Sequence, residues 1–204
     1  MYVTIRKYAG KGAVIDKLLP PVRDGLVPLL RQAPGFKGYY AFASEDGHVV
    51  TVAIFDDREA ATRANEQVRG WVASNLGELL PNLPEVLAGE ALLHDVSKLK
   101  DDDAEMFAVI RRYPDAAPEE KAVRVLREHI YPMLTASPGF RGHYSLSVEQ
   151  DGSRRAVAVS LFDARERAMV AQETAAGMMR THGLTGSAPS VLAGRLVLAA
   201  SAEG

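Results

Sequence analysis

Two kinds of hydrophobic pattern alternate along the chain. Short stretches in which polar and apolar residues alternate, beginning with 2–8, indicate β-strands. Longer stretches with apolar residues three or four positions apart indicate amphipathic helices, most clearly at Val123, Leu126, Ile130 and Met133. Read in order, the pattern predicts strand, helix, strand, strand, helix, strand, and the same order then follows a second time.

The second half of the chain repeats the first at a shift of about 105 residues. Four blocks return in the same order: 1–8 as 106–113, 34–40 as 138–144, 54–56 as 161–163, and 86–89 as 191–194. We therefore predict two copies of one α+β unit, over 1–95 and 106–204. The charged stretch 96–105 is predicted to be a solvated linker.

Glycine and proline mark the predicted turns and bends. Asp46-Gly47 and Asp151-Gly152 are typical of β-hairpin turns, because glycine accepts a positive φ. Pro28 and Pro132 fall inside the first helix of each copy, where a missing N–H donor is expected to bend the helix. Pro20-Pro21 predicts that the first helix of copy one begins only after this pair.

The order of elements predicts a ferredoxin-like βαββαβ unit, an antiparallel sheet with both helices on one face. Asp56 and Asp163, each with Glu three positions later, predict the start of the second helix. The face of the first strand that carries Tyr2, Thr4 and Tyr8, and its counterpart in copy two, is predicted to be left uncovered and too apolar for water. We expect the two copies to cover these faces, sheet against sheet, as an intramolecular pseudo-dimer.

Composition narrows the classes of function. A net charge of −2 with scattered Lys and Arg argues against nucleic-acid or membrane partners. The absence of cysteine excludes disulfide scaffolds, Cys-bound zinc and thiol nucleophiles, and it fits a cytoplasmic protein. The N-terminus is not typical of a signal peptide, and no stretch is apolar enough for a membrane span. The five histidines have no zinc-ligand spacing, and no hydrolase or nucleotide-binding motif occurs.

The repeated blocks resemble the antibiotic biosynthesis monooxygenase-like domains of the dimeric α+β barrel superfamily. The residues that carry the likeness, with their counterparts in copy two, are Tyr2–Arg6, Pro34-Gly35-Phe36, Asp46-Gly47, Phe55-Asp56 and Val86–Gly89. Because these domains usually pair as homodimers, the tandem chain resembles a fused dimer and implies a pseudo-dimeric α+β barrel. Characterised members include enzymes that oxidise aromatic polyketides to quinones without metal or flavin, and others that degrade haem.

The resemblance implies a pocket between the second helix and the sheet. Trp71 and Asn75 lie four apart on that helix, so Trp71 is a candidate to stack on an aromatic substrate and Asn75 to bond a phenol or oxyanion. The alternative places Trp71 in the core and Asn75 at its edge. Copy two has Met178 and His182 at the aligned places, so its pocket would differ or be absent. His182 is a candidate catalyst or a polar edge residue.

The second and first strands supply further candidates. In Tyr39-Tyr40 and in His143-Tyr144 only one residue of each pair can face the pocket, where it could transfer a phenol proton. Packing in the core is the alternative for each ring. Arg6 and Arg111 occupy equivalent places, and each could hold an anionic or enolate oxygen or take part in a structural ion pair.

Two hypotheses of function follow. The first is a cofactor-independent monooxygenase or oxidase, needing no metal or organic cofactor, that acts on a small aromatic substrate of phenolic or quinol-like type. The second is a non-catalytic small-molecule-binding or stress-related α+β barrel protein. The second predicts narrow or filled pockets, and an open, aromatic-lined cavity would contradict it. Further oligomerisation of the fused pair is left open.

Overall fold

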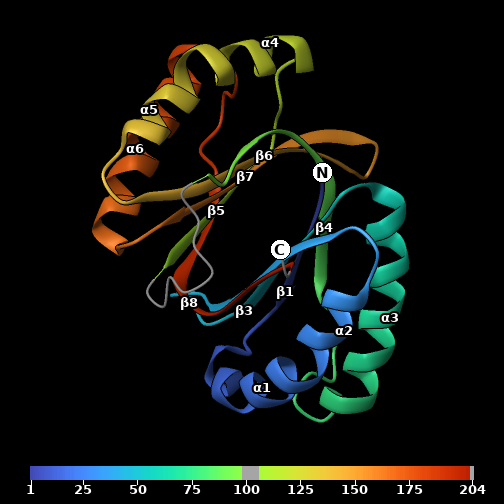
Figure 1. Cartoon of the computed structure of the whole chain (residues 1–204). Coiled ribbons are helices and arrows are strands. Elements are labelled where there is room, and N and C mark those ends of the chain that lie inside the picture. The colour runs from blue at the N-terminus through green and yellow to red at the C-terminus, as the bar shows by residue number, and fades with distance from the viewer. Residues whose placement is uncertain (98–105, 203–204) are drawn as a thin grey trace. The chain divides into compact units, whose positions relative to one another are not determined.

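The computed structural model describes residues 1–97 and 106–202, which form two compact units (Figure 1). Unit 1 contains Met1–Glu90 together with the end of the chain from Leu196. Unit 2 contains Ala91–Arg195. Each unit is an antiparallel sheet with helices packed on one face, so the predicted α+β fold of two βαββαβ copies is confirmed.

In unit 1 the strands follow the order β4-β1-β3-β2-β8. Their bounds are β1 (Tyr2–Tyr8), β2 (Phe36–Ala43), β3 (Val49–Phe55), β4 (Glu85–Asp95) and β8 (Ser190–Ser201). The helical elements are the 3₁₀ turn η1 (Gly12–Val14), α1 (Ile15–Pro21), the π-turn η2 (Val22–Leu26), α2 (Val27–Gln32) and α3 (Arg58–Leu76).

In unit 2 the strands follow the order β8-β5-β7-β6, with the end of β4 beside β6. Their bounds are β5 (Phe107–Tyr113), β6 (Phe140–Gln150) and β7 (Ser153–Phe162). The helical elements are α4 (Glu119–Val125), the π-turn η3 (Leu126–Ile130), α5 (Tyr131–Ala136) and α6 (Arg165–Thr181).

The last strand of each copy is divided between the two units. The first part of β8 pairs with β5, through Ser190–Arg195, whereas its last part, Leu196–Ser201, pairs with β2. The compact units therefore differ from the sequence repeats at the ends of β4 and β8. The predicted linker over 96–105 lies, from residue 98 onward, outside the described residues.

The helices cover the face of the sheet that carries Tyr8 and Thr4. Tyr8 is buried in one cluster with Leu18 of α1 and Ala64 of α3. Asn65 of α3 also donates from Nδ2 to Oγ1 of Thr4 at 3.3 Å. The prediction that this face is uncovered is therefore wrong. It is also wrong in unit 2, where Phe107, Val109 and Tyr113 are buried in one cluster with residues of the helices. Alternation along a strand reveals two faces but does not say which one receives the helices.

The opposite face of the sheet is buried as well. Val3 and Ile5 of β1 are 0 % and 2 % exposed, and Val52 of β3 is 1 % exposed. Both faces of a central strand such as β3 are therefore removed from water, and all seven of its residues are buried. This explains why β3 reads as a continuous apolar run.

The first helix of each copy contains a π-turn directly before its internal proline. Pro28 has no N–H to donate to the carbonyl four residues earlier, and the N–H of Val27 instead donates to Val22, five residues back. In copy two the N–H of Tyr131, directly before Pro132, donates to Leu126 in the same way. The two helices therefore share a π-turn directly before the proline at which a bend was predicted.

Three predicted helix starts need correction. The helix of copy one begins at Ile15 and includes Pro20-Pro21, because the φ of proline suits a helix and the exposed position of Pro20 leaves the freed carbonyl to water. The second helix of copy one is capped one residue later than expected, by Asp57 in place of Asp56, and Asp57 accepts from the N–H of Ala60 at 2.8 Å. In copy two Asp163 does not cap α6, because it precedes the N-cap position and binds arginine instead.

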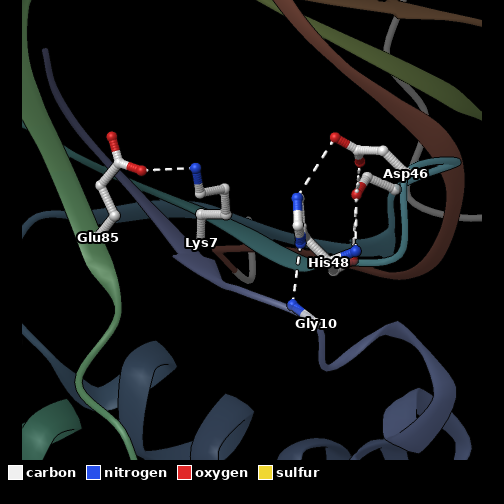
Figure 2. A network of polar contacts seen from close by, with 6 residues as sticks. Lys7, Gly10, Asp46, His48 and Glu85 are labelled. Atoms are coloured by element: carbon white, nitrogen blue, oxygen red, sulfur yellow. Dashed lines mark hydrogen bonds and ion pairs between the residues drawn. The ribbon is translucent and has the colours of Figure 1, made fainter.

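A polar network ties the β2–β3 hairpin to the turn after β1 (Figure 2). The N–H of Gly10 donates to Nδ1 of His48 at 3.0 Å, while Nε2 of His48 lies 3.4 Å from the carboxylate of Asp46. In a neutral ring Nε2 therefore carries the proton. The hydroxyl of Ser44 bonds Asp46 and not the imidazole, so these three residues form a structural clamp and no Ser-His-Asp relay.

The side chain of His48 is 25 % exposed and bonded at both ring nitrogens. Figure 2 also shows the ion pair of Lys7 on β1 with Glu85 on β4, at 2.6 Å.

Among the described residues, no helix is both long enough and apolar enough to span a membrane.

Candidate functional site

Each unit has a cavity between its helices and its sheet. The cavity of unit 2 encloses about 50 Å³, and that of unit 1 about 30 Å³. A cavity of about 150 Å³ is needed to hold benzene, so neither enclosed space takes a whole aromatic ring. The cavity of unit 2 continues into a hollow among partly exposed residues, Glu119 and Arg154, where it opens to solvent.

The cavity of unit 2 contains a buried guanidinium. Arg111 on β5 is 2 % exposed, and its Nη1 donates to the hydroxyl of Tyr113 at a long 3.5 Å. Its Nε is buried with no hydrogen-bond partner among the described residues. Burial lowers the pKa of Arg111, but a guanidinium keeps its charge at any ordinary pH. A buried cation held by one long hydrogen bond is costly, and an anionic ligand would relieve that cost.

Strand register explains why there is space beside this arginine. On the neighbouring strand β7, Ala158 lies opposite Arg111 and Ala156 lies opposite Tyr113. Cross-strand partners share a face of the sheet, so two small side chains stand next to two large ones. The helices close this space with Leu126, Ile130 and other apolar side chains, which gives a cavity with a dry wall and a polar floor.

A neutral histidine lies in the same floor. His143 on β6 is 1 % exposed, with Nδ1 2.8 Å from Oγ of Ser160 and Nε2 2.8 Å from Oγ of Ser145. Burial first, and then the positive charge of Arg111, lowers the pKa of His143 to about 3. The imidazole is therefore neutral at physiological pH, and both of its nitrogens already have partners.

Unit 1 satisfies its equivalent arginine differently. Arg6 on β1 lines the smaller cavity, and its Nη2 donates to Oδ1 of Asn65 at 2.6 Å. Tyr39, which lines the same space, has its pKa raised, mainly by burial. At the shift of 107 that relates the second helices, Asn65 corresponds to Gln172. No bond from Gln172 to Arg111 occurs among the described residues.

Four of the predicted site residues line a cavity. Tyr39 and Arg6 line that of unit 1, and His143 and Arg111 line that of unit 2. The neighbours Tyr40 and Tyr144 are buried on the opposite face of each sheet, as the alternation of strand side chains requires, and Tyr144 stacks on His94 with ring centroids 6.4 Å apart.

The helical candidates lie outside both cavities. Trp71 is half-buried against the core of unit 1, with its ring close to Gly25. Asn75 is exposed, and its Nδ2 donates to the backbone carbonyl of Trp71 at 2.8 Å. Met178 packs at the edge of the unit 2 core. His182 follows α6 and stacks on His129 at 4.3 Å between ring centroids.

Several cavity residues were not predicted from the sequence. Tyr113 stands two residues after Arg111, as Tyr8 does after Arg6, so their repeated spacing on one strand face was an available signal. Ser145, which lines the cavity, and Ser160, which bonds His143, carry no such signal, because serine is common on solvent-facing strand positions. Among the described residues, no three His, Asp or Glu side chains are placed to hold a metal ion.

Solved structures of other proteins share the fold of this chain. No family model and no curated protein matches the sequence. A candidate monooxygenase from Fusobacterium nucleatum subsp. nucleatum matches at TM-score 0.75 and 11 % identity, covering 100 % of this chain and 95 % of that one. This chain has the fold of the dimeric α+β barrel.

Other solved barrels have different chemistry. An anthrone oxidase-like protein matches at TM-score 0.63 and 13 % identity, over 100 % of this chain and 94 % of that one. A mutant chlorite dismutase from Candidatus Nitrospira defluvii matches at TM-score 0.59 and 11 % identity, over 97 % and 90 %. At such identities the likeness establishes the barrel fold, and the activity has to be argued from the site.

Proposed function

We propose that this protein oxidises a small phenolic or quinol-like aromatic substrate with dioxygen, using the cavity of unit 2. The observation that carries the proposal is the buried guanidinium of Arg111, whose Nε has no hydrogen-bond partner in the part of the chain that the structure describes and whose cavity opens to the surface. The fold shared with an anthrone oxidase-like protein and with a candidate monooxygenase supports the reaction class.

In this proposal Arg111 binds the substrate's phenolic oxygen and favours its anionic form, since a nearby positive charge lowers an acid's pKa. The proton leaves to solvent through the open end. The hydroxyls of Tyr113 and Ser145 line the same space and can donate to the developing oxyanion. His143 stays neutral and holds Ser145 in place.

The deprotonated substrate is electron-rich enough to reduce dioxygen. A hydroquinone would lose two electrons and two protons to O₂, which gives the quinone and hydrogen peroxide. An anthrone methylene would gain one oxygen atom of O₂ as a carbonyl, while its two hydrogens leave with the other oxygen atom as water. The enclosed space next to Arg111 takes the reacting oxygen, and the ring would occupy the open part of the hollow.

Oxygen uptake with a panel of hydroquinones and anthrones tests the proposal. Arg111→Gln should lower kcat/KM by about 10- to 150-fold, the effect of losing one charge-assisted hydrogen bond. Arg6→Gln is the matched control, because it removes the equivalent arginine of unit 1 and should leave turnover unchanged. Uptake equal in wild type and Arg111→Gln would contradict the proposal.

A non-catalytic binding protein is the second candidate, and one observation favours it. The enclosed spaces of about 50 and 30 Å³ are narrow. Under this alternative, small phenols would bind saturably and Arg111→Gln would weaken binding, while no substrate in the panel would consume oxygen.

A further inference from the structure

The open end of the unit 2 cavity has a second cation, on the same face as the first. Arg154 on β7 lines the cavity and is 31 % exposed. Along β7, Ala158 lies four residues from Arg154 and opposite Arg111 on β5. Residues an even number of positions apart on a strand share a face of the sheet, and four residues of a strand span about 13 Å. Arg111 and Arg154 therefore line one cavity from backbone positions about four residues apart along the sheet.

Arg154 is held by groups that a ligand can replace. Its Nη1 lies 3.2 Å from the carboxylate of Glu119 at the start of α4, and its Nη2 donates to the carbonyl of Ala117. Glu119 is 54 % exposed and contributes the one carboxylate among the lining residues. An exposed pair of this kind contributes little free energy, so a competing carboxylate can take its place.

Arg155 also lines the cavity, and its Nε is buried with no hydrogen-bond partner among the described residues. Two other charged groups near the entrance are bonded within the protein. Asp115 accepts from the hydroxyl of Thr185 and the N–H of Gly186, both at 2.7 Å, which joins the loop before α4 to the loop after α6. Lys121 donates to the carbonyl of Gly183 at 2.9 Å. Hydrogen bonds therefore hold together the loops around the cavity entrance. Arg154 pairs with the exposed side chain of Glu119, which a ligand can displace.

We propose that the substrate is an aromatic acid with an acidic oxygen at each end: a phenolic oxygen next to Arg111 and a carboxylate next to Arg154. The carboxylate displaces Glu119 and binds the guanidinium, whose planar fork suits two carboxylate oxygens. This inference rests on the proposed function for the phenolic end. The unit 1 cavity has no such second arginine among its lining residues, because β3 begins only at Val49, the counterpart of Ala156, and does not extend to the position of Arg154.

Two fluorescent probes test the inference on the full chain. Both 6-hydroxy-2-naphthoate and 2-naphthol carry the phenol, and only the first carries the distal carboxylate. Wild type should bind the naphthoate about two- to fivefold more tightly, by fluorescence anisotropy, as expected for a partly exposed ion pair. Arg154→Gln should remove that preference and leave 2-naphthol unchanged. Glu119→Gln should strengthen naphthoate binding by about threefold, because a competing carboxylate is gone.

Arg63→Gln is the control, since it breaks an exposed Arg–Glu pair on α3 in unit 1 and should change neither probe. Equal affinities for the two probes in wild type would overturn the inference, as would an Arg154→Gln effect of the same size on both. Oxygen uptake separates the two proposals. Uptake without a carboxylate preference contradicts this inference alone, and a carboxylate preference without uptake contradicts the proposed oxidation alone.

Discussion

Arg6 donates from Nη2 to Oδ1 of Asn65 at 2.6 Å, and this bond joins the first strand of unit 1 to its long helix. Asn65 in turn donates to the hydroxyl of Thr4 at 3.3 Å. The equivalent Arg111 of unit 2 has only the long contact to the hydroxyl of Tyr113 among described residues. One repeated arginine is thus bonded within its own core, and the other remains available to a ligand.

Asn65→Ala is therefore expected to destabilise the protein. The substitution leaves the buried guanidinium of Arg6 without its carbonyl acceptor, which costs about 1–3 kcal/mol. Urea unfolding gives the measurement. Thr62→Ala, on the exposed side of the same helix, is the control and should change the free energy of unfolding by less than about 0.5 kcal/mol. Equal effects of the two substitutions would contradict this account of Asn65.

The buried His143 predicts a loss of stability in mild acid. Its pKa in the folded protein is lowered to about 3, whereas an unfolded histidine titrates near 6.5. Below pH 6.5 the unfolded chain therefore binds a proton that the folded protein does not. The free energy of unfolding then falls by about 1.4 kcal/mol per pH unit as the pH drops from 6.5 towards 3.

His143→Asn removes this proton linkage. Between pH 7 and pH 5, wild type should lose roughly 2 kcal/mol more than His143→Asn, measured by urea unfolding at each pH. Carboxylate titrations are common to both proteins and cancel in the difference. Parallel pH profiles for the two proteins would show that the folded state protonates His143 as readily as the unfolded chain does.

Alanine substitutions at Gly139 and Gly152 are expected to distinguish the cost of backbone strain from the cost of steric overlap. Both have a left-handed φ, +74° and +72°. Nothing lies within 4 Å of a Cβ placed on Gly152, so Gly152→Ala should cost only the backbone term of about 1–2 kcal/mol. A Cβ on Gly139 would lie 1.9 Å from Oδ1 of Asp163, and Gly139→Ala should cost about 1–3 kcal/mol more. Thermal and urea unfolding of both variants measure the difference.

Trp71 should report on packing rather than on ligand binding. A Cβ added at Gly25 would lie 2.6 Å from Cζ2 of Trp71, so Gly25→Ala has to displace the ring. Because the chain has a single tryptophan, its emission should shift to longer wavelength in this variant. Gly70→Ala, where a Cβ meets no atom within 4 Å, should leave the emission unchanged.

Trp71→Phe and Asn75→Ala are expected to leave phenol binding and oxygen uptake within about twofold of wild type, since neither residue lines a cavity. Arg111→Gln serves as the positive control in the same assays. A large loss of turnover in Trp71→Phe would restore the helix-based site that the sequence suggested.

Local features of the chain determined the repeat, the order of strands and helices, and the turns. Their physical causes act within a few residues: side-chain periodicity, the lost N–H of Pro28 and Pro132, and the positive φ of Gly47 and Gly152. For the same reason the sequence placed Arg6, Arg111 and the second-strand pairs correctly on strands, with one residue of each pair facing a cavity.

The tertiary structure decided what depends on distant residues. Alternation along β1 is symmetric, so only packing could show that the Tyr8 face meets the helices. Helical spacing likewise placed Trp71 and Asn75 together but could not tell a cavity wall from an exposed edge. Whether an arginine is bonded or available depends on a partner 59 residues away, as Asn65 is from Arg6, and no local pattern encodes that contact. Burial and long-range pairing therefore make Arg111 the candidate site residue, because they leave its charge in a small cavity without a full set of partners.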